Sequence, residues 1–115
     1  MKPCQWAPGT RKAIRDMPPD VRLVFGHALH VASLGGKADN AKPMKGLGSG
    51  VLEIVEDHDG DTYRAVYTVR LPSGIYVLHA FKKKSKSGIA TPKQDIELIK
   101  ERLKWAMQTD SELRR

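Results

Sequence analysis

Three strand-like segments joined by two short turns constrain the fold of this chain more than any other feature. They span residues 51–57, 62–71 and 75–83 and are rich in Val, Ile, Tyr and Thr, which favour strands. The turns between them read Asp57-His58-Asp59-Gly60-Asp61 and Pro72-Ser73-Gly74. Because connections this short join antiparallel neighbours, the segments predict a three-stranded antiparallel meander.

The residues before the meander have the three- and four-residue spacing of helices. Thr10 predicts the N-cap of a short helix over 11–17, and Pro18-Pro19 must interrupt it because neither proline can donate a helical hydrogen bond. A second helix is expected from Asp20 to Gly35-Gly36. We expect the two helices to form an antiparallel pair that covers the sheet. The apolar stripe of the second helix comprises Val21, Val24, Phe25, Ala28, Val31 and Ala32.

A loop and a last helix complete the predicted elements. Residues 37–50 contain four further Gly or Pro residues and are expected to form an exposed loop. After the meander, Thr91 suits the N-cap, Pro92 the first helical position and Gln94 the partner in a capping box. The tail from Thr109 to 115 is polar and is expected to fray. The buried stripe of this helix comprises Ile96, Ile99, Leu103 and Ala106.

The composition favours one small, basic domain. The 115 residues suit a single core, the formal net charge is +7 and the isoelectric point is near 9.7. Residues 1–60 hold eight Lys or Arg against seven Asp or Glu, whereas residues 61–115 hold twelve against six. The surplus therefore lies in the second half, where a localised positive surface favours a polyanionic partner such as nucleic acid or an acidic protein.

Several other classes of protein are disfavoured. Cys4 is the only cysteine, which excludes an internal disulfide and a cysteine-rich zinc site. His27 and His30 lie three residues apart without further ligands on an obvious shared face, so neither a metal nor a cofactor is expected. No apolar run approaches the roughly 20 residues that span a bilayer, and the first residues lack a signal-peptide core. We expect a cytoplasmic protein without membrane contact.

A lysine cluster ends the third predicted strand. It comprises Lys82, Lys83 and Lys84, with Lys86 close behind. Strand alternation would place Lys82 and Lys84 on one face of the sheet and Lys83 on the other. Such a cluster is either a solvated strand end that discourages aggregation or a set of cations for a phosphate backbone.

The position of Arg64 in the central predicted strand is harder to explain. Its neighbours are apolar, and a buried guanidinium needs compensation. Arg64 either pairs with a carboxylate on the adjacent strand, such as Glu53 or Glu56, or faces a pocket for phosphate. His79, on the strand that leads into the lysines, is either a packed side chain or a general acid or base.

The order of the elements and several short segments resemble the HigB-like branch of the RelE/ParE toxin superfamily. The resemblance covers about residues 4–107. It implies a single α+β domain over 1–115, with an N-terminal strand, a two-helix antiparallel hairpin, the three-stranded meander and a C-terminal helix. The segments that carry the resemblance are residues 45–54, Tyr63-Arg64-Ala65-Val66-Tyr67, Ala80-Phe81-Lys82-Lys83-Lys84 and Thr91-Pro92.

The resemblance implies a toxin of a bacterial type II toxin–antitoxin system. Most members of the superfamily resemble ribosome-dependent endoribonucleases that cut messenger RNA in the decoding site. Two alternatives stay open: a gyrase-poisoning toxin of the ParE kind, and an inactive relative or non-enzymatic basic binding module. The implied partners are a cognate antitoxin, usually of the helix-turn-helix type, the ribosome with its messenger RNA, and operator DNA only through the antitoxin.

The implied reaction is attack by the RNA 2′-hydroxyl on the adjacent phosphate, which needs alignment, proton transfer and charge stabilisation but no metal. Arg64 matches the middle-strand arginine of the superfamily and is implied to stabilise the phosphate. Lys82, Lys83 and Lys84 would hold the RNA backbone, and one of them could transfer a proton.

Other positions are assigned less directly by the resemblance. Lys45 and Lys86 are implied to contact RNA or the ribosome. The chain has Glu53 and Glu56 in the first meander strand, where RelE-type proteins place lysines, and no tyrosine follows its lysine cluster. His79 and Tyr67 are therefore the open candidates for proton transfer.

Overall fold

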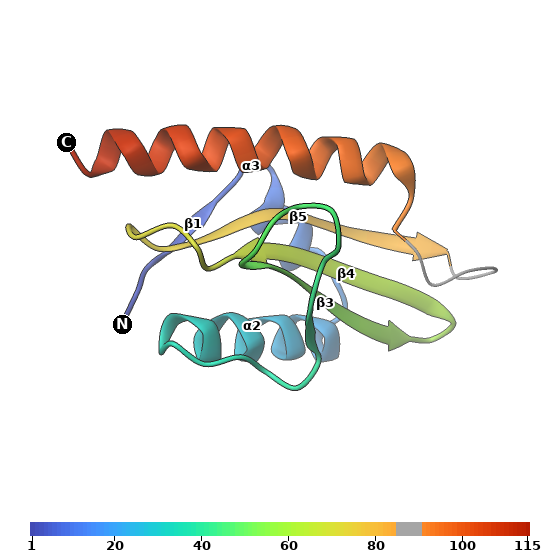
Figure 1. Cartoon of the computed structure of the whole chain (residues 1–115). Coiled ribbons are helices and arrows are strands. Elements are labelled where there is room, and N and C mark those ends of the chain that lie inside the picture. Colours follow the sequence, from blue (N-terminus) through green and yellow to red (C-terminus); the bar gives the residue numbers. More distant parts are fainter. Residues whose placement is uncertain (85–90) are drawn as a thin grey trace.

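One mixed five-stranded sheet organises the residues that the structure describes, 1–84 and 91–115 (Figure 1). The structure is a computed structural model, and the strand order in its sheet is β1-β5-β4-β3-β2. No helix in the described part of the chain is long and apolar enough to cross a membrane. The elements are β1 (Cys4–Trp6), α1 (Thr10–Arg15), α2 (Pro19–Ser33), β2 (Ala41–Pro43), β3 (Val51–His58), β4 (Asp61–Thr68), β5 (Ile75–Lys84) and α3 (Lys93–Leu113).

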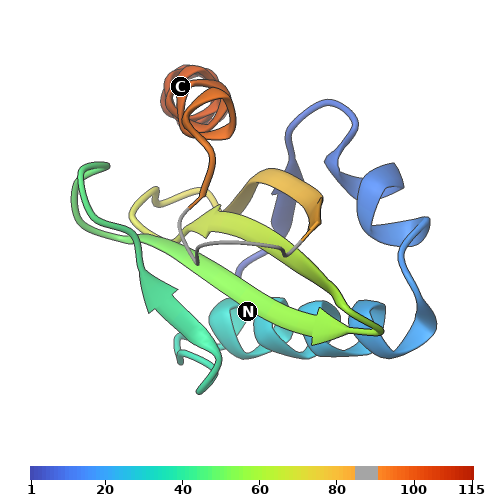
Figure 2. The ribbon, with the colours of Figure 1, turned by 90° about the vertical axis from the view of Figure 1, so that its right-hand side faces the viewer.

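Different helices cover the two faces of the sheet (Figures 1 and 2). Phe25 of α2 is fully buried in a core with Tyr67 of β4, on the face that α1 and α2 cover. Ile99 of α3 is equally buried in a second core with Val66 and Leu78, on the opposite face. The two cores explain why β4 is apolar on both faces, and they make the molecule a three-layer α+β structure.

The predicted meander is confirmed. β3 pairs antiparallel with β4 from Val51 opposite Thr68 to His58 opposite Asp61, and β4 pairs antiparallel with β5. Asp59 and Gly60 form the tight connection between β3 and β4, with φ angles of 49° and 83°. A two-residue turn with positive φ at both positions suits Asp-Gly, because Gly tolerates that region and Asp adopts it more readily than most residues do.

The predicted N-terminal strand is confirmed, and its pairing makes the sheet mixed. β1 lies parallel to β5, with Cys4 opposite Ile75 and Trp6 opposite Val77. The backbone of Pro3 approaches very closely here: a Cβ on Gly74 would lie 2.5 Å from the Pro3 carbonyl oxygen, and Ile75 N donates to that oxygen at 2.8 Å. Gly74 is therefore required for close contact between β1 and the start of β5.

The two-helix hairpin differs from the prediction in the size of its first member. α1 has six residues and ends at Arg15, so it is little more than one turn that leads into the long α2. The prediction that Thr10 caps α1 was wrong: Thr10 is the first helical residue, and its Oγ1 donates to Ala7 O at 2.7 Å. Gly9 occupies the N-cap position.

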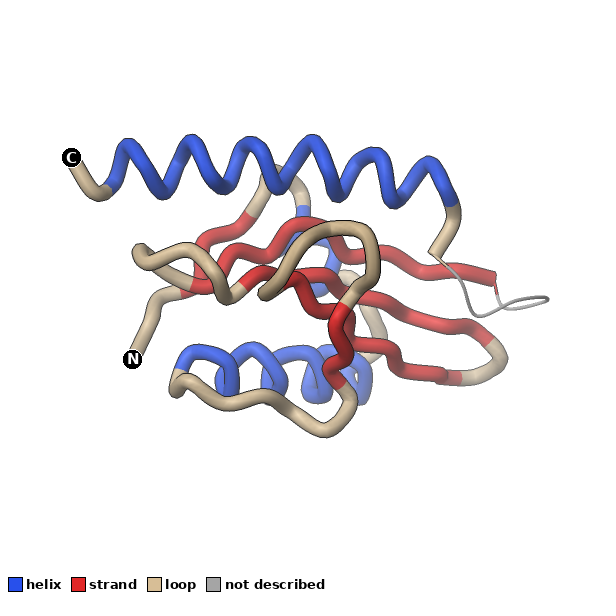
Figure 3. Tube along the Cα trace, in the orientation of Figure 1, coloured by secondary structure: helices blue, strands red, loops and turns tan. Residues whose placement is uncertain are grey.

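The expected loop over 37–50 contains a short edge strand, β2 (Figure 3). Ala41 pairs with Ile54 of β3 and is fully buried, and Leu47 is buried in the core under α3. The Gly and Pro content of this segment concealed the strand, because β2 is only three residues long and a proline, Pro43, ends it.

The ends of α3 also correct the predictions. Thr91 is not the N-cap, since Pro92 holds that position without a side-chain cap, and the Thr91 hydroxyl donates to Glu53 instead. The tail does not fray at Thr109, because α3 continues to Leu113. Asp110 explains the extension: it is buried, accepts a hydrogen bond from Ser73 N at 2.8 Å, and so fixes this part of the helix to the turn before β5.

Candidate functional site

A bulge in β5 determines which side chains of that strand face α3. Val66 pairs with His79, whereas the next residue of β4, Tyr67, pairs with Val77, so Leu78 falls between the two pairs. The extra residue lets Leu78 and His79 face the same side of the sheet. With strict alternation, His79 would face α2 instead. The bulge therefore brings His79 to the face that carries Arg64.

Five side chains lie on this face near the start of α3, in two hydrogen-bonded groups, and we call them the polar cluster: Glu53, Arg64, His79, Thr91 and Asp95. Arg64 Nη1 donates to Glu53 Oε1 at 2.9 Å, and Thr91 Oγ1 donates to Glu53 Oε2 at 2.6 Å. The Arg64 side chain is 5% exposed and that of Glu53 is 15% exposed. Of the alternatives for Arg64, the structure shows the carboxylate pair, with Glu53 as the partner.

His79 and Asp95 form the second half of the polar cluster. His79 Nε2 lies 2.8 Å from Asp95 Oδ1, and its ring stacks on Phe81 with 4.6 Å between the centroids and 18° between the planes. Asp95 lies in the first turn of α3, where a carboxylate also complements the helix dipole. These contacts fix the orientation of the imidazole and tie the start of α3 to β5.

The polar cluster combines three kinds of chemistry. A guanidinium can bind a phosphate through two parallel hydrogen bonds, an imidazole can accept or donate a proton near neutral pH, and a carboxylate can accept a proton or orient either of the other groups. In this structure Arg64, Glu53 and His79 are engaged with one another or with the start of α3. Substrate access to Arg64 would require these contacts to open.

The lysines at the end of β5 face different sides of the sheet, as strand alternation predicted for Lys82 and Lys83. Lys82 lies opposite Tyr63, on the α2 side, and its Nζ is 3.5 Å from Asp61 Oδ2. Lys83 lies opposite Thr62, on the same side as Arg64. Lys84 ends β5 opposite Asp61. The side chain of Lys84, and Lys86 altogether, lie outside the described residues.

Two further candidates are not brought into the polar cluster. Tyr67 lies on the opposite face of β4, in the core under α2, and is fully buried. Its Oη has no hydrogen-bond partner among the described residues, and burial raises the pKa of the phenol. Lys45 is exposed in the loop between β2 and β3, and within residues 1–84 and 91–115 no hydrogen bond or ion pair joins it to the cluster.

Sequence reasoning missed Asp95 and Thr91 as partners in the polar cluster. Asp95 gave one signal, an acidic residue at the start of a helix, but the helix dipole explains that pattern equally well. Thr91 was assigned to the cap of α3 because its spacing to Gln94 fits a capping box. In the described residues, no group of three or more His, Cys, Asp or Glu side chains is arranged to hold a metal ion.

The chain matches the model of a known protein family over most of its length. The family is described as "Phage derived protein Gp49-like (DUF891)", and the match covers residues 12–104. The matched region runs from α1 into α3, so it contains the whole meander and the whole polar cluster. No curated protein and no solved structure matches the chain significantly.

Proposed function

Since this chain belongs to the Gp49-like family, a RelE/ParE-like toxin family of toxin–antitoxin systems, we propose that it is a toxin that cuts messenger RNA on the ribosome. The proposal places the chain near the HigB-like branch of the superfamily. The observation that carries it is the polar cluster, which places a guanidinium, a carboxylate and an imidazole on one face of the sheet, the face that Lys83 shares at the end of β5.

Each side chain has a role in the proposed reaction. Arg64 binds the phosphate under attack and stabilises the charge of the transition state, while Glu53 positions the guanidinium. His79 transfers a proton to or from the RNA, and Asp95 holds the imidazole in place. The residues with proposed RNA or ribosome contacts are Lys45, Lys82, Lys83, Lys84 and Lys86.

The burial of Arg64 supports a dependence on the ribosome. Its side chain is 5% exposed, so an RNA phosphate reaches it only when contacts around it, such as that of Thr91 with Glu53, open. Opening them costs free energy, and the binding of a free RNA strand by a few lysines offsets little of that cost. When the toxin is bound to the ribosome and the messenger RNA is fixed in the decoding site, more binding free energy is available to offset the cost.

The proposed partners follow from the toxin role. A toxin of such a system pairs with an antitoxin, which we propose to be of the helix-turn-helix type. Operator DNA would be contacted through that antitoxin and not by this chain. The ribosome and its messenger RNA are the proposed targets, in the cytoplasm, and no cofactor is needed for attack by the 2′-hydroxyl.

Controlled induction tests the proposed function. We expect wild-type induction to stop growth and to create new messenger RNA 5′ ends, mapped by primer extension. Arg64→Ala should reduce these ends by roughly 100-fold or more, because an oxyanion-stabilising group is typically worth that factor. Arg22→Ala is the matched control, since Arg22 is exposed on α2 at the other face and should behave as wild type.

The outcomes separate the alternatives. The Arg64→Ala variant must give the wild-type circular dichroism spectrum at the assay temperature. If that variant is unfolded, Arg64→Lys is tested in its place. Wild-type induction without new RNA ends would refute messenger RNA cleavage. Growth arrest with gyrase-dependent DNA breaks would instead identify a ParE-like toxin, and unchanged growth would identify an inactive relative or a binding module.

A further inference from the structure

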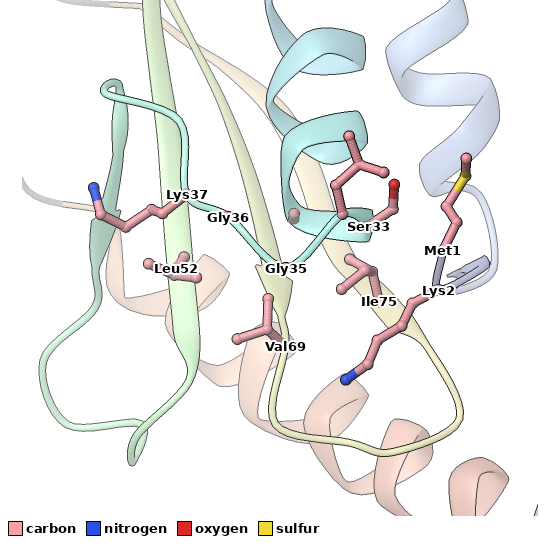
Figure 4. Close-up of a pocket in the computed structure, with 11 residues that line it drawn as sticks. Met1, Lys2, Ser33, Gly35, Gly36, Lys37, Leu52, Val69 and Ile75 are labelled. Atoms are coloured by element: carbon pink, nitrogen blue, oxygen red, sulfur yellow. The ribbon is translucent and has the colours of Figure 1, made fainter.

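A pocket of about 500 Å³ opens between the end of α2, the N-terminal residues and the sheet (Figure 4). Its floor is apolar and consists of Leu52, Val69 and Ile75. Ile75 is the first residue of β5, so the pocket lies at the opposite end of that strand from the lysine cluster. Leu52 and Ile75 belong to the core that α1 and α2 cover, whereas the polar cluster lies on the α3 face, so the pocket and the polar cluster lie on opposite faces of the sheet.

Two exposed apolar side chains border this pocket. The described chain has five large apolar residues with high exposure, and two of them, Met1 and Leu34, line the pocket. Met1 is 88% exposed and Leu34 is 61% exposed. Exposed apolar side chains that continue into an apolar floor are typical of an interaction site rather than of scattered surface residues.

The charges around the pocket are positive. Lys2 and Lys37 lie on opposite sides of the apolar floor (Figure 4), and none of the described residues that line the pocket is acidic. The ammonium group of Lys37 is held in place, because its Nζ donates to Ala41 O at 2.9 Å and to Ala38 O at 3.3 Å. The complementary ligand is an apolar side chain flanked by carboxylates.

We propose that this pocket binds an acidic, amphipathic segment of the antitoxin, with an apolar side chain on the floor and carboxylates near Lys2 and Lys37. The inference rests on the proposed function only in that a toxin of this family has an antitoxin partner. A second copy of the chain fits less well, because a symmetric dimer through this surface would bring the lysines of two molecules of charge +7 together.

The affinity of the purified cognate antitoxin for the purified toxin, measured by isothermal titration calorimetry, tests the apolar part of the proposal. We expect Leu34→Glu to weaken binding by roughly 10- to 100-fold, the usual effect of losing an interface anchor. Leu23→Glu is the matched control, because Leu23 is also an exposed leucine of α2, at 73%, but does not line the pocket. It should change the affinity less than about 3-fold.

A pair of charge reversals tests the electrostatic part. Lys2→Glu should lower the affinity for the antitoxin at low salt. The difference in affinity from wild type should shrink as added salt screens the charges. Lys104→Glu, an exposed lysine of α3 outside the pocket, makes the same change in net charge and should have a much smaller effect. Equal effects of the two reversals would show that net charge rather than this pocket determines binding.

Amide hydrogen exchange of the complex provides a check that needs no substitution. We expect the antitoxin to protect the amides of residues 33–37, with the lysine end of β5 changed less. The proposal would be overturned if Leu34→Glu and Leu23→Glu lowered the affinity for the antitoxin equally, or if the wild type did not bind it. It would also be overturned if the antitoxin protected amides only at the lysine end of β5. Messenger RNA cleavage is measured without the antitoxin. A lack of cleavage would therefore refute the proposed function but would not affect the result on antitoxin binding.

Discussion

Replacing Arg64 by Met removes the positive charge that faces the largely buried carboxylate of Glu53, and we expect it to destabilise the protein by about 3 kcal/mol. Loss of one member of a buried ion pair costs about 3–5 kcal/mol. The lower end applies because Glu53 is 15% exposed and keeps its hydrogen bond from Thr91. For a chain of this length, about 3 kcal/mol corresponds to a fall in Tm of about 10–15 °C.

A double-mutant cycle separates the ion pair from its surroundings. Urea denaturation of Arg64→Met, Glu53→Leu and the double variant gives the coupling free energy, which we expect to be about 2 kcal/mol or more. The double variant should be more stable than the sum of the single changes predicts, because it leaves neither charge buried. A coupling below about 0.5 kcal/mol would refute the conclusion that the pair stabilises the fold.

An exposed ion pair in the same chain is the control. Lys12 Nζ lies 2.6 Å from Asp16 Oδ2, closer than the atoms of the Arg64–Glu53 pair, but the two side chains are 72% and 60% exposed. Water and salt screen such a pair, so the cycle of Lys12→Met and Asp16→Asn should show a far smaller coupling. Equal couplings for the two pairs would mean that burial does not set the energy.

Three other substitutions test separate parts of the structure. Tyr67→Phe should leave RNA cleavage unchanged and alter the unfolding free energy by less than about 1 kcal/mol, because the buried Oη has no partner among the described residues; loss of cleavage would restore Tyr67 as a catalytic candidate. Gly74→Ala should lower stability by more than about 1 kcal/mol in urea denaturation, because its Cβ would meet the Pro3 carbonyl; an unchanged midpoint would show that β1 moves aside easily. Hydrogen bonding from Ser73 lowers the pKa of Asp110, so this carboxylate stabilises the fold fully above the unfolded pKa of about 3.9, and the stabilisation is lost as the pH falls through the lower folded value. The difference in Tm between wild type and Asp110→Asn should therefore shrink in acid, and an equal difference at about pH 7 and pH 2.5 would contradict this account.

Local signals made the helices and the meander predictable. Apolar spacing identified α2 and the buried stripe of α3, and two short turns required antiparallel neighbours for β4. The ends of the helices were less predictable, because Thr10 and Thr91 both use their hydroxyls for bonds other than the expected caps. Cap preferences are worth only about 1 kcal/mol, so tertiary contacts can override them.

The assembly of the polar cluster could be predicted only in part. The expectation that a buried Arg64 needs a partner followed from the cost of an uncompensated charge, and Glu53 was one of two possible partners. The neighbours of His79 could not be predicted, because its face depends on a bulge at Leu78 that has no mark in the sequence. Periodicity places a side chain correctly only as far as the strand stays regular.

The parallel pairing of β1 with β5 has a consequence for how the protein is made. Cys4 can find its partner only after Ile75 has been synthesised, and the last core closes only when α3, the final helix of this chain, packs on the sheet. Such distant pairings form late, because the chain between them must first be ordered. The contacts of the polar cluster likewise need Thr91 and Asp95, so the nascent chain lacks an assembled polar cluster while most of it is being translated, and the activity proposed for that cluster would arise only late in synthesis.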